Sequence, residues 1–258
     1  GIAKNKGFDY CIPDHSKVTW FDKTVNGITH TMYHQLQHLF EMNNLNGRYG
    51  NIEGGNQIDV HQLEFCKELF DECPDNSSLL GHFESYHYFE NAEEELRKDY
   101  VVRRYLLDVA KKFHKDLHNP VCVSVRRGDF IKYQDHHAPC VESYYRECME
   151  RLGERQFVFI SDDIEWCKSV FTGDNCVFNE EIPGGMNKGH VDFAVGSLCN
   201  DFIIANSTFS WWVAWVGMNK ESKVFIPSPW FGPANAHLDT EGYYHPQFTT
   251  VEREIVRV

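Results

Sequence analysis

The second half of the sequence constrains the fold most, because it alternates short apolar runs with segments of helical spacing. From residue 121 onward the apolar runs are "VCVSV", "QFVFIS", "CVF", "DFIIA" and "KVFIP". The helix-like segments between them lie near residues 142–152, 163–170, 190–200 and 208–218. Short buried strands that alternate with helices are typical of a parallel sheet with crossover helices. The pattern therefore predicts an α/β fold, in which ligands bind at the carboxyl ends of the strands.

Three polar clusters directly follow predicted strands, at residues 126–129, 161–163 and 206–210. In the first, a planar guanidinium such as that of Arg126 can hold a diphosphate through two parallel hydrogen bonds and stabilise charge on a leaving group. A surface salt bridge with Asp129 is the alternative, and this motif alone leaves both open. The tripeptide Arg127-Gly128-Asp129 also occurs in adhesive proteins. Here it follows a buried strand instead of lying at an exposed loop tip, which disfavours adhesion.

The second cluster lies in "FISDDIEW" (159–166) and contains two neighbouring carboxylates. Paired aspartates can bind a divalent ion, but the side chains of Asp162 and Asp163 diverge if the backbone is extended. Ser161 or Asp162 can instead cap a helix whose first turn contains Glu165. Capping is the favoured interpretation, with one aspartate also touching a nucleotide or sugar, and no metal site is predicted.

The third cluster lies in "DFIIANSTFSWWVAW" (201–215), where a predicted strand gives way at once to an aromatic-rich helix. Unpaired N–H groups at a helix start, together with the side chains of Ser207, Thr208 and Ser210, can bind phosphate. The tryptophans at 211, 212 and 215 are spaced for packing in the core. A Gly-rich stretch, "IPGGMNKGH" (182–190), could form a pocket loop with Lys188 and His190.

Charge and cysteine content exclude several classes of protein. The 258 residues carry a formal net charge of -13, which disfavours nucleic-acid and anionic-membrane partners. No signal peptide is predicted, and no apolar stretch is long enough for a membrane span. The nine cysteines are odd in number and include no C-x-x-C pair, so we expect free thiols in a reducing compartment. The expected location is cytoplasmic, or the Golgi lumen if a membrane anchor was removed.

One further helix is predicted before the alternating region. Asn91 suits an N-cap, and the glutamates at 93–95 suit the positive start of a helix. The apolar residues Val102, Leu106, Val109 and Phe113 then follow at helical spacing. The tripeptide "HNP" at 118–120 ends the pattern. The spacing predicts one helix through this stretch.

The three clusters, with two further segments, resemble a known enzyme family. "VSVRRGDF", "FVFISDDIEW" and "DFIIANSTFSWWVAW" resemble successive signature motifs of the alpha-1,2-fucosyltransferases, glycosyltransferase family 11. "LLGHFESYHYFEN" (79–91) resembles the family's G-Y-F-Q-S-x-x-Y-F segment, and "VFIPSPWF" (224–231) resembles its final strand and P-x-x-W. The order and approximate spacing agree over residues 79 to 231.

The resemblance implies a GT-B arrangement, in which two Rossmann-like domains face a cleft. It also implies an inverting transfer of L-fucose from GDP-L-fucose to O2 of a galactoside in an oligosaccharide or glycan acceptor, with no metal and no cofactor. Residues 1–118 would form an N-terminal acceptor-side domain, and residues 119–258 a C-terminal GDP-sugar-binding domain.

The resemblance also assigns roles to residues. Arg126 would hold the donor diphosphate, while Arg127 and Asp129 would shape the site. The other donor-binding residues that it implies are Ser161, Asp162, Asn206, Ser207, Thr208, Phe209 and Ser210. For the catalytic general base, Asp129 and Asp135 are candidates by residue type and by their proximity to the arginines, with His137 behind them.

The chain departs from the family pattern at two places. The family usually carries His two residues before the first arginine, where this chain has Ser124. The family's N-terminal G-G-x-G-N-Q-x-F strand and loop is absent, so we expect an early segment to be missing. Two alternatives follow: an inverting fucosyltransferase of another linkage (alpha-1,6 or protein O-fucosylation), or an inactive GDP-sugar-binding module. The full "NSTFSWW" stretch favours the alpha-1,2 group.

Overall fold

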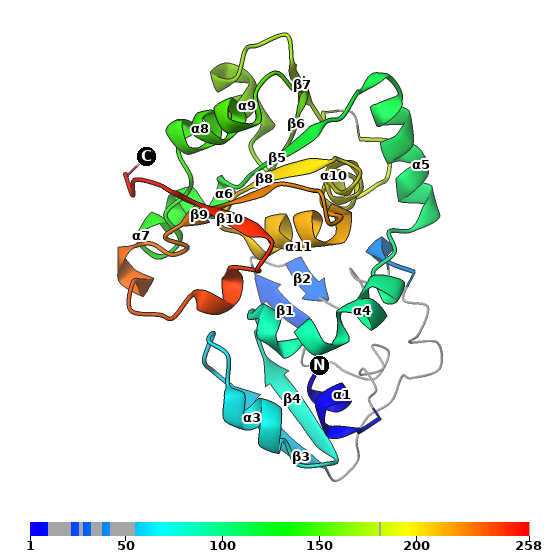
Figure 1. Ribbon diagram of the computed structural model, residues 1–258, viewed down its shortest axis with the longest axis vertical. Helices are drawn as coiled ribbons and strands as arrows, with labels where there is room; N and C mark the ends of the chain where they lie inside the picture. Colours follow the sequence, from blue (N-terminus) through cyan, green and yellow to red (C-terminus); the bar gives the residue numbers. More distant parts are fainter. Residues whose placement is uncertain (10–21, 26–27, 32–37, 42–54, 181, 258) are drawn as a thin grey trace. The chain divides into compact units, whose positions relative to one another are not determined.

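The computed structural model describes residues 1–9, 22–25, 28–31, 38–41, 55–180 and 182–257 (Figure 1). The chain forms two compact units. Unit 1 comprises Gly1–Arg103 with Glu241–Tyr243, and unit 2 comprises Arg104–Thr240 with Tyr244–Val258. The domain boundary expected at residues 118 and 119 stays a prediction.

Unit 2 is built on a six-stranded sheet in which every pair of neighbouring strands is parallel. The strand order is β10-β9-β8-β5-β6-β7. The strands are β5 (Val121–Val125), β6 (Phe157–Ser161), β7 (Cys176–Phe178), β8 (Asp201–Ile204), β9 (Val224–Ser228) and β10 (Phe248–Glu252). The predicted α/β fold is thereby confirmed. The chain adds strands outward from β5 in one direction and then from β8 in the other, so a topological switch point lies between β5 and β8.

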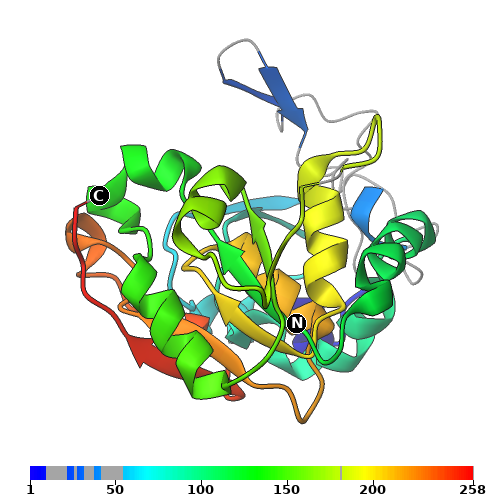
Figure 2. The same cartoon turned by 90° about the horizontal axis from the view of Figure 1, so that it is seen from above.

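Helices cover both faces of this sheet (Figure 2). The buried side chains of Val121, Val123 and Val125 lie in one core cluster with residues of α8 (Glu142–Leu152) and α9 (Ile164–Val170). The alternate residues of β5 point the other way, because successive side chains of a strand face opposite sides. On that side, α10 (Lys188–Ser197) packs against β5, β6 and α11 (Thr208–Gly217).

The remaining elements of unit 2 are short, apart from one longer helix. The α5 helix (Arg104–Phe113) packs against α10 and continues into the 3-10 turn η4 (His114–Asp116). The α6 (Gly128–Lys132) and α7 (Gln134–His137) helices follow β5 and the two arginines, and α7 packs against the 3-10 turn η5 (Pro233–Asn235). The segment of α6 and α7 therefore leaves the sheet at its carboxyl edge.

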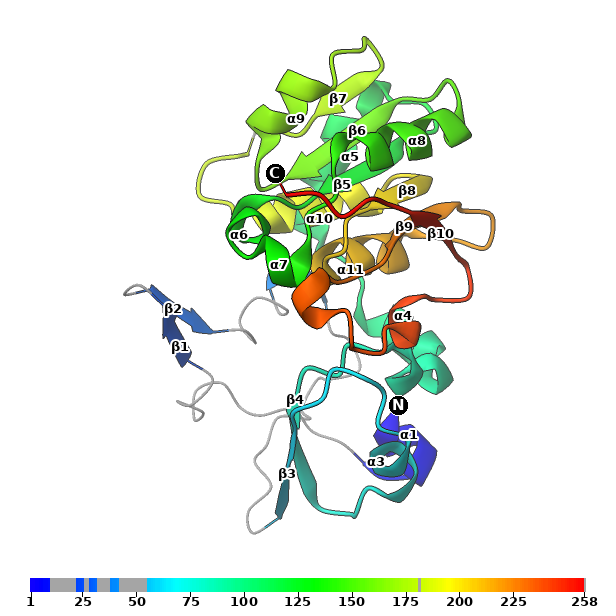
Figure 3. The same ribbon diagram turned by 90° about the vertical axis from the view of Figure 1, so that its left-hand side faces the viewer.

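Unit 1 contains two small sheets among its described residues (Figure 3). The strands β1 (Asp22–Val25) and β2 (Ile28–Thr31) pair antiparallel, and β3 (Asn56–Val60) pairs parallel with β4 (Ser77–Gly81). The helices of unit 1 whose bounds lie within the described residues are α1 (Ile2–Lys6), α3 (Lys67–Glu72) and α4 (Glu93–Asp99). The described part of unit 1 also contains the 3-10 turns η2 (Tyr86–Tyr88), η3 (Glu90–Ala92) and η6 (Glu241–Tyr243).

The prediction of a single helix from about residue 92 is wrong. The structure has two helices, α4 and α5, separated by residues 100–103. Within this interruption, Val102 forms an isolated antiparallel bridge with Phe40, and both side chains are buried. The apolar Val102 thus fits the helical period, but its backbone pairs with a distant segment instead.

Candidate functional site

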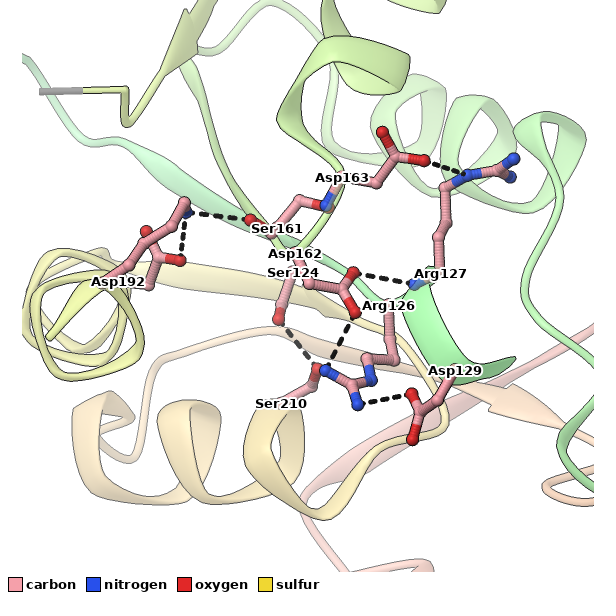
Figure 4. A network of polar contacts seen from close by, with 10 residues as sticks. Ser124, Arg126, Arg127, Asp129, Ser161, Asp162, Asp163, Asp192 and Ser210 are labelled. Carbon is pink, nitrogen blue, oxygen red and sulfur yellow. Dashed lines mark hydrogen bonds and ion pairs between the residues drawn. The ribbon is translucent and has the colours of Figure 1, made fainter. Parts of the chain in front are cut away.

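The first polar cluster begins where β5 ends, at the switch point of the sheet. The Arg126 guanidinium forms an ion pair with Asp129 in the first turn of α6. It forms a second ion pair with Asp162, with 2.9 Å between Nη1 and Oδ2 (Figure 4). About a third of the side chain (36%) is exposed, so the guanidinium is held in place and remains accessible to a ligand.

Asp162 is the residue that connects the first two clusters. Besides the ion pair with Arg126, its Oδ1 accepts a hydrogen bond from the backbone N–H of Arg127 at 2.9 Å. A Cβ atom at position 128 would overlap the Asp162 carboxylate, so this close approach requires glycine. β5 and β6 are neighbouring parallel strands, and this register brings residue 162 next to residues 126–128.

Arg127 has different surroundings from Arg126. Its side chain is 14% exposed, and its Nε donates to Oδ2 of Asp163 at 3.1 Å. Its guanidinium lies 4.0 Å from the centre of the Trp166 ring, in cation–π geometry. Asp163 also caps α9, because its Oδ1 accepts from the N–H of Trp166 at 3.2 Å. The helix is therefore capped as expected, but by Asp163 instead of Ser161 or Asp162.

Ser161 and the Gly-rich segment meet through Lys188. The Ser161 hydroxyl accepts from the N–H of Asp163 at 2.9 Å, and the Lys188 ammonium donates to the Ser161 carbonyl at 2.9 Å. Lys188 also pairs with the buried Asp192, which accepts from Asn179 at 2.7 Å. Burial raises the pKa of Asp192, while Lys188 opposes this rise. The sequence reasoning missed Asp192, although its i, i+4 spacing from Lys188 was a usable signal.

The third cluster, between β8 and α11, is divided between buried and exposed residues. Asn206 is buried, and its amide donates to the carbonyls of His137, Ala138 and Trp230. Ser210 is also buried, and its hydroxyl shares a hydrogen bond with that of Ser124 at 2.8 Å. Ser124, which stands where the family carries His, thus ties β5 to the first turn of α11.

The residues between Asn206 and Ser210 form the start of α11. Ser207 is the N-cap residue, and its side chain makes no capping hydrogen bond. Thr208 and Phe209 are exposed. Of the five residues implied as donor ligands in this cluster, Thr208 and Phe209 are therefore the two with exposed side chains.

The candidate general bases lie in different places. Asp129 contacts Arg126 directly. Asp135, in α7, forms an ion pair with Arg257 at 2.9 Å, and both side chains are largely exposed. The His137 ring stacks on Phe130, with 4.3 Å between ring centres. The structure therefore brings Asp129, and not Asp135, into contact with the arginines.

The described residues contain neither a cluster of side chains suited to a metal ion nor a membrane-spanning helix. Among them, no group of three or more His, Cys, Asp or Glu side chains is arranged to hold a metal ion. Within the same part of the chain, no helix has the length and apolar character that crossing a bilayer requires. The described cysteines are all free thiols, and Cys11 lies outside the described residues.

Comparison with known proteins relates this chain to sugar transferases. A family model, "Glycosyl transferase family 11", matches residues 4–251. An alpha-1,2-colitosyltransferase from Escherichia coli is 32% identical over 182 residues, which are 65% of this chain and 61% of the relative. The galactoside alpha-(1,2)-fucosyltransferase 1 of Ateles belzebuth is 28% identical over 157 residues, covering 51% of this chain and 40% of the relative.

The chain thus spans about 40 to 61% of the length of these relatives. Among solved structures, NodZ alpha-1,6-fucosyltransferase soaked with GDP-fucose matches 55% of this chain and 51% of its own. The TM-score is 0.37 and the identity 13%, so this similarity is too distant to support an inference.

Proposed function

Because the chain belongs to glycosyl transferase family 11, we propose that it moves L-fucose from GDP-L-fucose to a glycan hydroxyl. The linkage would be alpha-1,2, and the anomeric centre would be inverted. The observation that carries this proposal is Arg126, an accessible guanidinium held by Asp162 at the carboxyl edge of a parallel sheet. Such an edge is where α/β folds bind their ligands.

Arg126 is the proposed ligand of the donor diphosphate. In the free protein its guanidinium is paired with Asp129 and Asp162. The diphosphate would replace Asp129 as a partner, while Asp162 keeps the guanidinium oriented. The start of α11 would supply a second contact, because first-turn N–H groups have no partner within a helix and attract anions. Thr208 and Phe209 are exposed there and would line this part of the donor site.

The other implied residues act in this proposal as supports. Arg127 would fix the strand end through Asp163 and Trp166. Asn206 and Ser210 would fix the start of α11 through their buried hydrogen bonds. Ser161 would place the Asp162–Asp163 turn through its hydroxyl and its bond from Lys188.

The proposed reaction is a single displacement. The oxygen of the acceptor hydroxyl forms a bond with the anomeric carbon of fucose, on the face opposite the diphosphate. The bond between that carbon and the diphosphate oxygen breaks, and its electron pair leaves with GDP. Arg126 stabilises the charge that develops on this oxygen. Asp129, released from Arg126 when the diphosphate takes its place, is the proposed general base that accepts the proton of the hydroxyl. No metal ion or cofactor is needed in this scheme.

The assay that tests this function uses the full chain with GDP-L-fucose, a panel of galactosides and an excess of EDTA. We expect fucose transfer that EDTA does not diminish, and linkage analysis should show an alpha-1,2 bond. Arg126→Ala should lower turnover about a hundredfold or more, since one donor to developing charge is lost. The control Arg146→Ala removes an exposed arginine that pairs with Glu142 and should leave turnover unchanged. No transfer to any acceptor would favour an inactive GDP-sugar-binding module, and a requirement for manganese would contradict the metal-free scheme.

The assignment of the base has its own test. Asp129→Asn should reduce kcat by about 10²–10⁴-fold, as expected when a general base is removed. Asp135→Asn is the matched control, because Asp135 pairs with Arg257 and does not contact Arg126. The reverse result, with the larger loss in Asp135→Asn, would transfer the role to Asp135.

A second candidate is the transfer of colitose. The observation that favours this candidate is sequence identity. The alpha-1,2-colitosyltransferase is 32% identical to this chain over the matched residues, whereas the fucosyltransferase of Ateles belzebuth is 28% identical. The same assay with paired fucose and colitose donors, read as the ratio of kcat/KM, distinguishes the two. A ratio in favour of colitose would replace fucose as the proposed donor sugar.

A further inference from the structure

Arg253 is a buried arginine whose hydrogen bonds all go to uncharged carbonyl groups. It directly follows β10, it is 8% exposed, and no described carboxylate forms an ion pair with it. Its Nε donates to the carbonyl of Pro229 at 3.0 Å, and its Nη2 donates to that of Trp230 at 3.3 Å. Its Nη1 donates to the carbonyl of Ala138. Burying a guanidinium is unfavourable unless its donors are satisfied, so this arrangement needs these three loop carbonyls in place.

The carbonyls that Arg253 binds are also bound by Asn206. The Asn206 amide donates to the carbonyl of Trp230 at 2.8 Å and to that of Ala138 at 3.4 Å. It donates further to the carbonyl of His137. Two buried side chains, one following β8 and one following β10, therefore converge on the turn that ends α7. We call the side chains of Asn206 and Arg253, which hold this turn, the carbonyl clamp.

The turn held by the clamp has an unfavourable backbone conformation. Ala138 has φ 46° and ψ 84°, and positive φ is disfavoured for a residue with a Cβ atom. Such a conformation persists only where surrounding contacts fix it. The hydrogen bonds of Arg253 and Asn206 to the Ala138 carbonyl are contacts of this kind.

A chain of contacts connects the clamp to the candidate diphosphate ligand. The ring of His137 stacks on that of Phe130 at 4.3 Å between centres. The guanidinium of Arg126 lies 5.5 Å from the centre of the Phe130 ring. Phe130 is buried in α6, beside Asp129. A change in the turn at Ala138 would therefore shift the helix that carries Asp129 and packs on Arg126.

From this arrangement we infer that Arg253 is a positioning residue for the transfer reaction. It holds the strained end of α7, and through α6 it fixes Asp129 and Arg126 in their relative positions. This inference rests on the proposed function of Arg126. It assigns to Arg253 no contact with the substrate.

Arg253→Met is the test, and Arg155→Met is its matched control. Arg155 lies at the opposite, amino-terminal edge of the sheet, where it donates to the carbonyl of Asn119 at 2.8 Å and pairs with Asp201 at 2.9 Å. Because this variant leaves a carboxylate without its arginine, the control should lower Tm at least as much as Arg253→Met. Amide hydrogen exchange of residues 128–140 and steady-state kinetics are measured well below the lowest Tm.

We expect Arg253→Met to increase exchange across residues 128–140 and to lower kcat roughly tenfold to a hundredfold, as a small displacement of reacting groups would. The KM for GDP-L-fucose should change less than kcat, and Arg253→Lys should recover part of the turnover. Arg155→Met should keep both wild-type exchange in 128–140 and wild-type kcat. Wild-type exchange in Arg253→Met, or equal kcat losses in the two Met variants, would overturn the inference. Absence of transfer by the wild-type chain would instead refute the proposed function, and the exchange data would still report on the clamp.

Discussion

Two adjacent arginines follow β5, and their surroundings predict different consequences of mutation. Arg126 is accessible and held by two carboxylates that are themselves partly exposed. Arg127 is nearly buried between Asp163 and the face of Trp166. Exposed ion pairs contribute little to stability, whereas a desolvated cation–π contact contributes more. We therefore expect Arg126 to matter for turnover and Arg127 for stability.

Arg127→Ala should lower the stability of unit 2 by about 1–2 kcal/mol, the range for a largely desolvated cation–π contact. For a unit of this size, that loss corresponds to a fall in Tm of roughly 2–8 °C. Arg126→Ala is the matched comparison, and its Tm should stay close to that of the wild type. Calorimetry measures both variants. A larger Tm loss for Arg126→Ala than for Arg127→Ala would contradict this division of roles.

Gly128→Ala should disturb the site through Asp162. The added methyl group overlaps the Asp162 carboxylate, so that side chain must leave either Arg126 or the N–H of Arg127. A misplaced catalytic group lowers turnover by up to about a hundredfold, and we expect a loss of this order in kcat. Gly184→Ala is the control, because a Cβ there meets no atom within 4 Å. Equal activity of the two variants would show that Asp162 does not position Arg126.

At the scale of elements, some helices and strands follow from local pattern and others do not. The buried strands β5, β6 and β8 are predominantly apolar, as expected for a parallel sheet covered on both faces. β10 was not predicted, because three of its five residues are exposed and the run "FTTVE" is not apolar. The break between α4 and α5 was missed for another reason. The bridge between Val102 and Phe40 joins residues far apart in the sequence. The helical spacing of the apolar residues gives no indication of this bridge.

One contact between elements should make stability depend on pH. The His114 imidazole in η4 contacts the carbonyl of Val195 in α10, with 2.8 Å from Nε2. Burial lowers the pKa of His114 below its ordinary value, and the hydrogen bond to Val195 only partly offsets this. The unfolded chain therefore binds a proton more readily than the folded one. The contribution of His114 is fully present above about pH 6.5 and is lost as the pH falls towards its lowered pKa in the folded state.

His114→Gln should remove this dependence, because glutamine can donate to the Val195 carbonyl but does not titrate. The free energy of unfolding, measured in urea from about pH 7 down to about pH 5, should fall less in this variant than in the wild type. His118→Gln replaces a nearby exposed histidine and should retain the wild-type slope. If both variants retained that slope, His114 would not be the titrating group.

At the scale of the whole molecule, the chain path shows that the two units are not simply consecutive. The turn η6 belongs to unit 1, although the residues on both sides of it belong to unit 2. In unit 1 the Tyr243 side chain is buried, and its hydroxyl donates to Glu84. Glu241 lies 3.3 Å from His87, and a Cβ at Gly242 would overlap Ser85. Unit 1 therefore includes contacts with residues from late in the sequence.

Tyr243→Phe should destabilise unit 1 while leaving unit 2 unchanged. The substitution removes the hydroxyl that donates to the Glu84 carboxylate, and a hydrogen bond to a charged group contributes about 1.5–3 kcal/mol. Tyr244→Phe is the matched control, since this neighbouring residue is assigned to unit 2. Hydrogen exchange in residues 77–99 reports on unit 1. Increased exchange there in Tyr244→Phe alone would contradict the assignment of the contact.

The sequence by itself determined the α/β class, the parallel strands and the placement of polar clusters at strand ends, because these features depend on local period and composition. It did not determine the partners of those clusters. Arg126 meets Asp162 because β5 and β6 are neighbours in register. Asn206 and Arg253 meet at the Ala138 carbonyl because β8 and β10 end at the same edge as β5. Strand order and register set these long-range contacts, and only the tertiary structure specifies them.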